Sequence, residues 1–120
     1  MNTYDAIVVG SGMSGGWAAK EHTEKGLKTS VLERGRDVKH VKDYPTAALD
    51  PWQLPHRNLI TSEDLETYPI QSKVYHFGED NKHFFVKDNE HTYGQVKPFL
   101  WTQGNQVGGK SLLWSRHTFR

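Results

Sequence analysis

Three glycines near the start of the chain have the spacing of a turn that binds a dinucleotide. Gly10, Gly12 and Gly15 form Gly-x-Gly-x-x-Gly directly after an apolar run and directly before a helical pattern. In such a turn the first glycine allows a sharp bend, the second lets the backbone approach a pyrophosphate, and the third lets the helix pack closely on the strand. The N–H groups that open the helix, those of Met13 and Ser14 among them, would face the phosphates.

An acidic residue completes this pattern. Glu33 directly follows a second apolar run, residues 29–32, at the distance from the glycines that the pattern requires. A carboxylate there accepts a hydrogen bond from a ribose hydroxyl and disfavours a 2′-phosphate, which argues against NADP. Arg34 and Arg36 come next; each would lie near the adenine or a phosphate, or would belong to a solvated turn, and both interpretations stay open.

A second glycine-rich stretch occupies residues 104–116. Gly108 and Gly109 would allow another close backbone approach, to a phosphate or to a flavin ring, and Ser111 adds a hydroxyl. Leu113 and Trp114 add an apolar wall. A Gly-Gly turn is common in itself, so this stretch indicates a cofactor site only in combination with the first glycine turn.

These motifs predict an α/β fold. A strand at residues 4–9, a helix from residue 13 or 14 to about 25 and a strand at 28–33 would form a Rossmann-like βαβ unit, with Gly26 ending the helix. The first strand reads as buried on both faces, because its apolar residues do not alternate with polar ones.

The segment at 37–72 has weak periodicity and contains four prolines, and we expect an irregular excursion there. One short helix is predicted at 62–67, capped by Thr61 or Ser62. A long irregular segment is uncommon inside a small domain, so it would form a lid or lie against protein outside this chain.

Two β-rich runs, 73–77 and 82–87, flank a turn at 78–81 and predict an added β-hairpin. Another short strand, interrupted by Pro98, is expected at 96–101.

Composition excludes several classes of protein. The 120 residues include 15 basic and 14 acidic side chains, so neither nucleic acid nor an anionic membrane is an expected partner. There is no cysteine, and the seven histidines lack metal-ligand spacing, so no metal site is expected. No signal peptide or membrane-spanning run is visible, which predicts a cytoplasmic protein or, alternatively, one exported to the periplasm with a signal-bearing subunit.

The residues 10–15, 32–35 and 107–114 together resemble the glucose-methanol-choline (GMC) oxidoreductases. The last stretch is most similar to the branch that holds pyranose oxidase, gluconate 2-dehydrogenase flavoprotein subunits and bacterial glucoside 3-dehydrogenases. The resemblance covers essentially the whole chain. It implies that residues 1–120 are the N-terminal FAD-binding region of a longer, two-domain enzyme.

The resemblance also implies which residues hold FAD. Those expected to contact the cofactor are Gly10, Gly12, Met13, Ser14 and Gly15 at the pyrophosphate, Glu33 and Arg34 at the AMP portion, and Gly108, Gly109, Ser111, Leu113 and Trp114 along the pyrophosphate and the flavin. Pyranose oxidases carry a histidine that bonds covalently to the flavin at the place where this chain has Leu113. The implied FAD is therefore non-covalent.

Family members oxidise an alcohol carbon by hydride transfer to flavin N5, with a histidine base paired to a second histidine or an asparagine. That pair is not found in these 120 residues, so no catalytic residue is assigned here. The branch implies a dehydrogenase acting on a sugar or glycoside hydroxyl, with a small subunit, a cytochrome or a quinone pathway receiving the electrons.

Two other interpretations remain. The chain could be an inert dinucleotide-binding fragment. Alternatively, Tyr93 and Lys97 have the spacing of NAD-dependent short-chain dehydrogenases, but Gly94 and Pro98 disfavour the helix which that chemistry needs, and no serine stands at the usual distance upstream.

Overall fold

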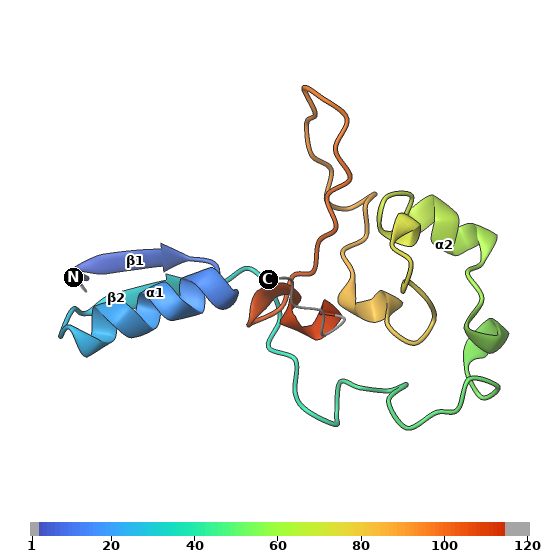
Figure 1. The fold of residues 1–120 in the computed structure, drawn as a ribbon, viewed down its shortest axis with the longest axis horizontal. Coiled ribbons are helices and arrows are strands. Elements are labelled where there is room, and N and C mark those ends of the chain that lie inside the picture. The colour runs from blue at the N-terminus through green and yellow to red at the C-terminus, as the bar shows by residue number, and fades with distance from the viewer. Residues whose placement is uncertain (1–2, 115–120) are drawn as a thin grey trace, which may run out of the picture. The chain divides into compact units, whose positions relative to one another are not determined.

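The computed structural model describes residues 3–114, and the chain divides into two compact units. Unit 1 is Met1–Val38 with Asn105–Arg120, and unit 2 is Lys39–Gly104. Unit 1 contains the strands and the longer helix, whereas unit 2 is built from one short helix, turns and loops (Figure 1).

Unit 1 begins with a β-α-β arrangement. Strand β1 (Ala6–Val9), helix α1 (Met13–Glu24) and strand β2 (Thr29–Leu32) follow one another, and the two strands pair in parallel with Val9 opposite Leu32. The α/β class is thereby confirmed, and the three elements fall within the ranges expected from the sequence. The helix ends where Gly26 takes a positive φ of 81° and donates its N–H to the carbonyl of Thr23.

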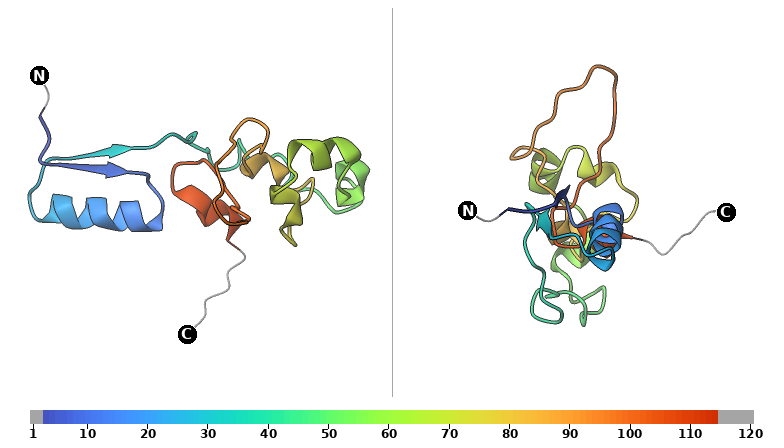
Figure 2. Two further views of the ribbon diagram at one scale, coloured as in Figure 1. Left: turned by 90° about the horizontal axis from the view of Figure 1, so that it is seen from above. Right: turned by 90° about the vertical axis from the view of Figure 1, so that its left-hand side faces the viewer.

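Helix α1 packs on one face of the strand pair (Figure 2). The close contact depends on Gly15, because a Cβ there would lie 2.0 Å from the carbonyl oxygen of Gly10 and 3.3 Å from a methyl group of Val8. Val8 is correspondingly the buried residue of β1. The third glycine of the turn therefore has the packing function that the sequence assigned to it.

The opposite face of the pair is uncovered. Ile7, Val9 and Leu32 point away from α1 and are 63%, 83% and 55% exposed. The expectation that β1 is buried on both faces is wrong for the described chain, since residues 3–114 provide a layer for one face only.

Unit 2 has an aromatic core. Tyr68 and Phe77 pack with ring centroids 5.2 Å apart, and Phe77 and Phe85 with centroids 5.1 Å apart. Edge-on and tilted ring pairs of this kind add stabilisation beyond the apolar area they bury. These rings come from residues 68–85 and pack together in a unit that contains little regular secondary structure.

A buried polar cluster organises the same unit. The amide of Gln71 is fully buried, donates to Asp88 Oδ1 (2.8 Å) and to the carbonyl of Trp101 (3.0 Å), and accepts from the N–H of Gln103 (2.9 Å). Asp88 Oδ2 in turn accepts the N–H groups of Ile70 and Gln71. Both buried side chains are therefore hydrogen-bonded, as buried polar groups in stable proteins are, and they connect residues 70–71, 88 and 101–103.

The short helix expected in the excursion is present. Helix α2 spans Ser62–Thr67, and Thr61 is its cap: the Thr61 hydroxyl accepts the N–H of Asp64, whose carboxylate accepts the N–H of Thr61. This reciprocal capping box satisfies two N–H groups that a helix start leaves unpaired.

The predicted β-hairpin is wrong. Residues 73–87, which are all described, form no strand; residues 71–73 and 82–84 are 3₁₀ turns instead. Asn81 accepts the N–H of Gly78 and donates to the carbonyl of His76, and the N–H of Lys82 bonds back to Gly78. These local bonds occupy the backbone groups that a strand ladder needs, and they override the β propensity of the flanking residues.

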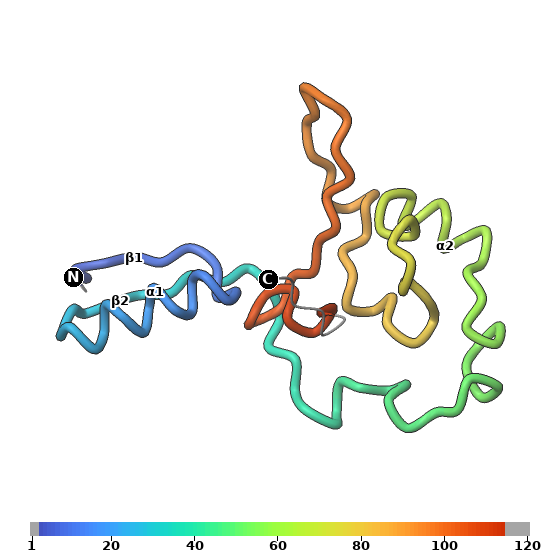
Figure 3. Tube along the Cα trace, viewed as in Figure 1, coloured from blue at the N-terminus to red at the C-terminus, as the bar shows by residue number. Residues whose placement is uncertain are grey.

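The strand expected at 96–101 is also absent from the structure. Residues 93–101 form a long loop that extends away from the rest of unit 2 (the orange segment in Figure 3). The Tyr93 hydroxyl donates to the carbonyl of Phe99 and accepts the N–H of Trp101, which closes the base of the loop. None of the helices within residues 3–114 has the length and apolar character needed to cross a membrane.

The contact at Gly15 predicts a contrast between neighbouring glycines. Gly15→Ala places a methyl group against the Gly10 carbonyl and should destabilise the protein by roughly 1–3 kcal/mol. Gly16→Ala places a methyl at an ordinary contact distance, 3.9 Å from the Ser11 carbonyl, and should stabilise α1 by about 0.5–1 kcal/mol. Urea unfolding followed by circular dichroism measures both changes, and equal effects would contradict the packing described.

Candidate dinucleotide-binding site

The two glycine stretches meet in unit 1. A Cβ on Gly109 would lie 2.9 Å from the Cα of Gly12, and a Cβ on Gly12 would lie 3.9 Å from the Cα of Gly109. Gly108 and Gly109 have φ angles of 89° and 66°, in the left-handed region that favours glycine. The first and second glycine loops therefore form one continuous backbone surface without side chains, although they come from opposite ends of the sequence.

Glu33 lies beside this surface, immediately after β2. Its Oε2 accepts the N–H of Ser11 (2.8 Å) and the Ser11 hydroxyl (2.7 Å), and its Oε1 accepts the N–H of Gly35 (2.7 Å). The hydroxyl of Ser11, followed by the backbone N–H groups of Ser11 and Gly35, lowers the pKa of the carboxyl to about 2. Glu33 is thus a fixed carboxylate that is ionised at neutral pH.

Further contacts join the segment after β2 to the segment before the second loop. Arg36 pairs with Gln106 in a parallel bridge, and Arg34 donates to the side chain of Asn105 (3.1 Å). Gly35 permits the approach, because a Cβ there would lie 2.3 Å from the carbonyl carbon of Asn105. Sequence reasoning assigned a role to Arg34 but missed Gly35 and Asn105, whose importance lies in a contact between residues far apart in the chain.

The start of α1 is suited to an anion. Gly12 is the N-cap residue and provides no capping side chain, and the first turn contains no acidic residue. Met13 and Ser14 are exposed there. A helix start without a carboxylate partner keeps its N–H groups and its positive dipole end for a phosphate.

The remaining predicted contact residues follow Gly109 in a 3₁₀ helix, Gly109–Leu113. The Ser111 hydroxyl donates to the carbonyl of Gly108 (2.7 Å), Leu113 is half-buried and Trp114 is exposed. All the residues expected to contact FAD therefore belong to unit 1. The last two residues of the second stretch, Ser115 and Arg116, lie outside the described residues, as does His117.

These features fit a dinucleotide. A surface of backbone atoms, a helix start open to phosphate and an ionised carboxylate at the end of the adjoining strand are the groups that recognise pyrophosphate and ribose. A Cβ at Gly12 would have room in the protein itself, so the absence of a side chain there is not required by packing. A ligand that approaches the backbone closely at Gly12 would account for the glycine there.

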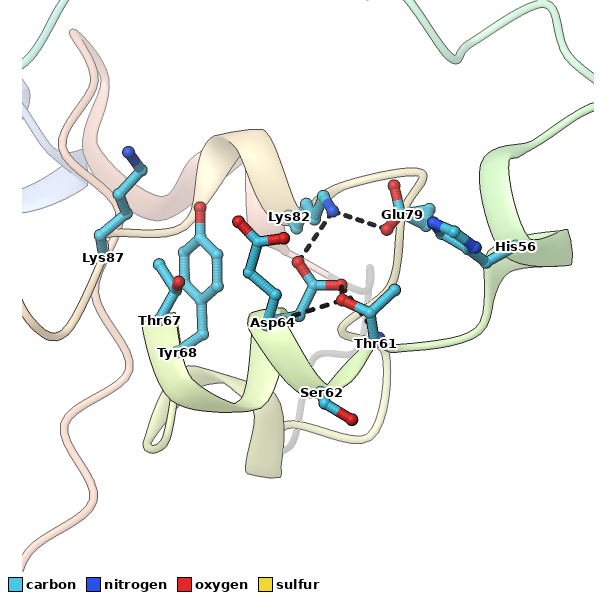
Figure 4. A pocket seen from close by; sticks show the side chains of 10 residues that line it. His56, Thr61, Ser62, Asp64, Thr67, Tyr68, Glu79, Lys82 and Lys87 are labelled. Carbon is cyan, nitrogen blue, oxygen red and sulfur yellow. Dashed lines mark hydrogen bonds and ion pairs between the residues drawn. The ribbon is translucent and has the colours of Figure 1, made fainter.

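Unit 2 contains a separate polar cleft of about 600 Å³ (Figure 4). Its lining residues are His56, Thr61, Ser62, Glu63, Asp64, Thr67, Tyr68, Glu79, Lys82 and Lys87. Lys82 Nζ lies between two buried carboxylates, 2.8 Å from Asp64 and 2.6 Å from Glu79. Burial opposes the charge on Asp64, but hydrogen bonds from Lys82 and Thr61 outweigh it and lower the pKa to about 2. The cluster ties α2 to the turn at 79–82.

The spacing of Tyr93 and Lys97 is not matched by a helix in the structure. Tyr93 and Lys97 lie in the long loop of unit 2, and residues 93–97 form no helix, so they lack the geometry of a short-chain dehydrogenase. Within residues 3–114, no group of three or more His, Asp or Glu side chains is placed to hold a metal ion.

Comparison with known proteins gives matches to oxidoreductases. The gluconate 2-dehydrogenase flavoprotein of Pantoea cypripedii is 35% identical over 119 residues, which are 97% of this chain and 17% of that protein. The L-amino acid oxidase Lm29 of Lachesis muta is 32% identical over 103 residues, which are 80% of this chain and 20% of that protein. The L-amino-acid oxidase of Echis ocellatus is 32% identical over the same extent.

The chain spans about a fifth of the length of these relatives. No protein-family profile matches it, and no solved structure does. The names agree on oxidation as the reaction and include a flavoprotein, which supports a flavin-dependent oxidoreductase in general.

The ion cluster of unit 2 predicts a pH dependence. The folded-state pKa of Asp64 lies below the ordinary 3.8, so its contribution to stability is present above that pH and is lost as the pH falls towards 2. Asp64→Asn should remove this contribution, on the order of 2 kcal/mol at neutral pH, and should reduce the loss of stability on acidification.

Glu63→Gln is the matched control. Glu63 is an exposed neighbour in α2, and its substitution removes the same charge without touching the ion cluster of Asp64, Glu79 and Lys82. Urea midpoints measured from neutral pH down to about 3 compare the variants. An Asp64→Asn protein with the acid sensitivity of the wild type would contradict the assigned cause.

Proposed function

We propose that this chain is the FAD-binding part of a GMC-type dehydrogenase that oxidises a sugar or glycoside hydroxyl to a carbonyl. The observation that carries the proposal is the contact between the two glycine loops beside Glu33. A single dinucleotide can reach both loops and the carboxylate, because all three lie within unit 1. The β1-α1-β2 arrangement, interpreted as the start of a Rossmann-like sheet, supports the same conclusion.

The residues of the chain have distinct functions in this proposal. Glu33 accepts a ribose hydroxyl, the start of α1 and the backbone at Gly12 receive the pyrophosphate, and the second glycine loop with Trp114 borders the flavin. The cofactor is held non-covalently, because Leu113 has no nucleophilic atom to bond to it. When bound, the flavin supplies the hydride acceptor; the residues described here bind and orient it.

The sugar or glycoside assignment is supported by the extent of the match to the gluconate 2-dehydrogenase flavoprotein, which covers 97% of this chain. A second candidate is oxidation of an amino acid, supported by the matches to L-amino acid oxidases over 80% of the chain. Both candidates need the same FAD site and differ in the group that donates the hydride.

The full-length protein that contains this chain should purify with the visible absorption of a flavin. Denaturation should release the flavin, because it is not bonded covalently to the protein. Anaerobic addition of gluconate, glucose or a simple glycoside should bleach that absorption, whereas L-amino acids should not. Bleaching by L-amino acids alone would favour the second candidate. A colourless protein that does not take up added FAD would contradict both.

Gly12 provides a test of the cofactor's position. Within 4 Å, a Cβ at this residue would meet only the Cα of Gly109, at 3.9 Å, and the backbone angles are open to any residue. Gly12→Val should therefore fold, yet lower FAD affinity by roughly tenfold or more, because its methyl groups occupy the surface that the phosphate approaches. Gly16→Val is the matched control on the same helix, and retained flavin in Gly12→Val protein would contradict the placement.

Partners and location follow from the same proposal. We propose that the electrons pass to a small subunit or a cytochrome, and that the protein acts in the cytoplasm or is carried to the periplasm by a signal-bearing subunit. Co-purification of a haem protein with the full-length enzyme would support the first of these proposals.

A further inference from the structure

Ser11 makes contacts on both sides of the proposed cofactor site. Its hydroxyl donates to Glu33 Oε2 (2.7 Å) and accepts the N–H of Gly108 (3.0 Å). The residue is part-buried and lies between the first two glycines of the first loop. One side chain therefore joins the ribose-binding carboxylate, the first glycine loop and the second glycine loop.

We propose that the Ser11 hydroxyl is a positioning group that couples the two halves of the FAD site. This inference rests on the proposed function and concerns how that site is assembled. The hydroxyl is oriented by its strongest acceptor, the ionised Glu33, so that its oxygen lone pairs face Gly108. The bond to Ser11 thereby adds to the contacts that hold the second loop in the position at which it borders the flavin, and it depends on Glu33 and the first loop being in place.

The geometry predicts that loss of the Ser11 hydroxyl affects the two halves of the FAD site unequally. The backbone N–H of Ser11 also binds Glu33, at 2.8 Å, and this bond does not depend on the side chain. Removing the hydroxyl therefore leaves Glu33 attached to the first loop, and it removes the bond that holds the Gly108 N–H of the second loop to the first. The ADP half of FAD, which contacts Glu33 and the first loop, should be affected less than the flavin half.

The test compares two ligands in the full-length protein. In wild type and in Ser11→Ala, the dissociation constants of FAD and of ADP are measured by calorimetry on apoprotein. Ser11→Ala should weaken FAD roughly three- to tenfold, as expected for the loss of one or two hydrogen bonds, and should weaken ADP clearly less. Ser11→Thr retains a hydroxyl and should restore most of the FAD affinity.

Ser30→Ala is the control, because it removes a hydroxyl from β2 of the same unit, outside both glycine loops. Equal losses for FAD and ADP, or no loss for either, would overturn the coupling while leaving the proposed function intact. Wild-type protein that binds neither ligand would instead overturn the proposed function, and the coupling with it. Should Ser11→Ala protein fail to fold, Ser11→Cys, whose thiol is a weaker donor and acceptor, is measured in the same way and should weaken FAD more than ADP; equal losses would overturn the coupling.

Discussion

The carboxylate of Glu33 fixes the arrangement of unit 1. It accepts three hydrogen bonds from the first glycine loop and from the turn after β2, and through them it sets where the loop lies relative to the strand end. The charge-assisted bonds favour the ionised form strongly, which is why the carboxyl pKa falls to about 2. A loop without large side chains gains its definite shape from this acceptor and from backbone contacts.

Glycines allow those contacts at several points. The approaches at Gly15, Gly35 and Gly109 each bring backbone within a distance that a Cβ would prevent. They connect the helix to the strand, the turn after β2 to the segment at 105–106, and the two glycine loops to each other. Unit 2 is stabilised differently, by edge-on and tilted aromatic rings and by the buried amide of Gln71, so the two units depend on different interactions.

The sequence predicted the elements that local signals determine. The glycine turn, α1 and α2 with its Thr61 cap follow from short-range rules, and the structure confirms their positions. The hairpin at 73–87 was wrong because β propensity describes a fit to a sheet, and the turn bonds around Asn81 provide an alternative for the same backbone groups.

The contributions of Ser11 and Gly35 could not be predicted because their partners lie far along the chain. A serine between two glycines carries no pattern by itself, and its role depends on Gly108, which is 97 residues away. The residues of the cleft in unit 2 were missed for a similar reason: Asp64 and Lys82 are 18 residues apart and are brought together by the fold alone.

The uncovered face formed by Ile7, Val9 and Leu32 affects how this chain gains its stability. A layer placed over those three side chains would remove their apolar surface from water, and such burial stabilises a fold by about 25 cal/mol per Å². Covering this face would therefore raise the melting temperature of the two-stranded unit.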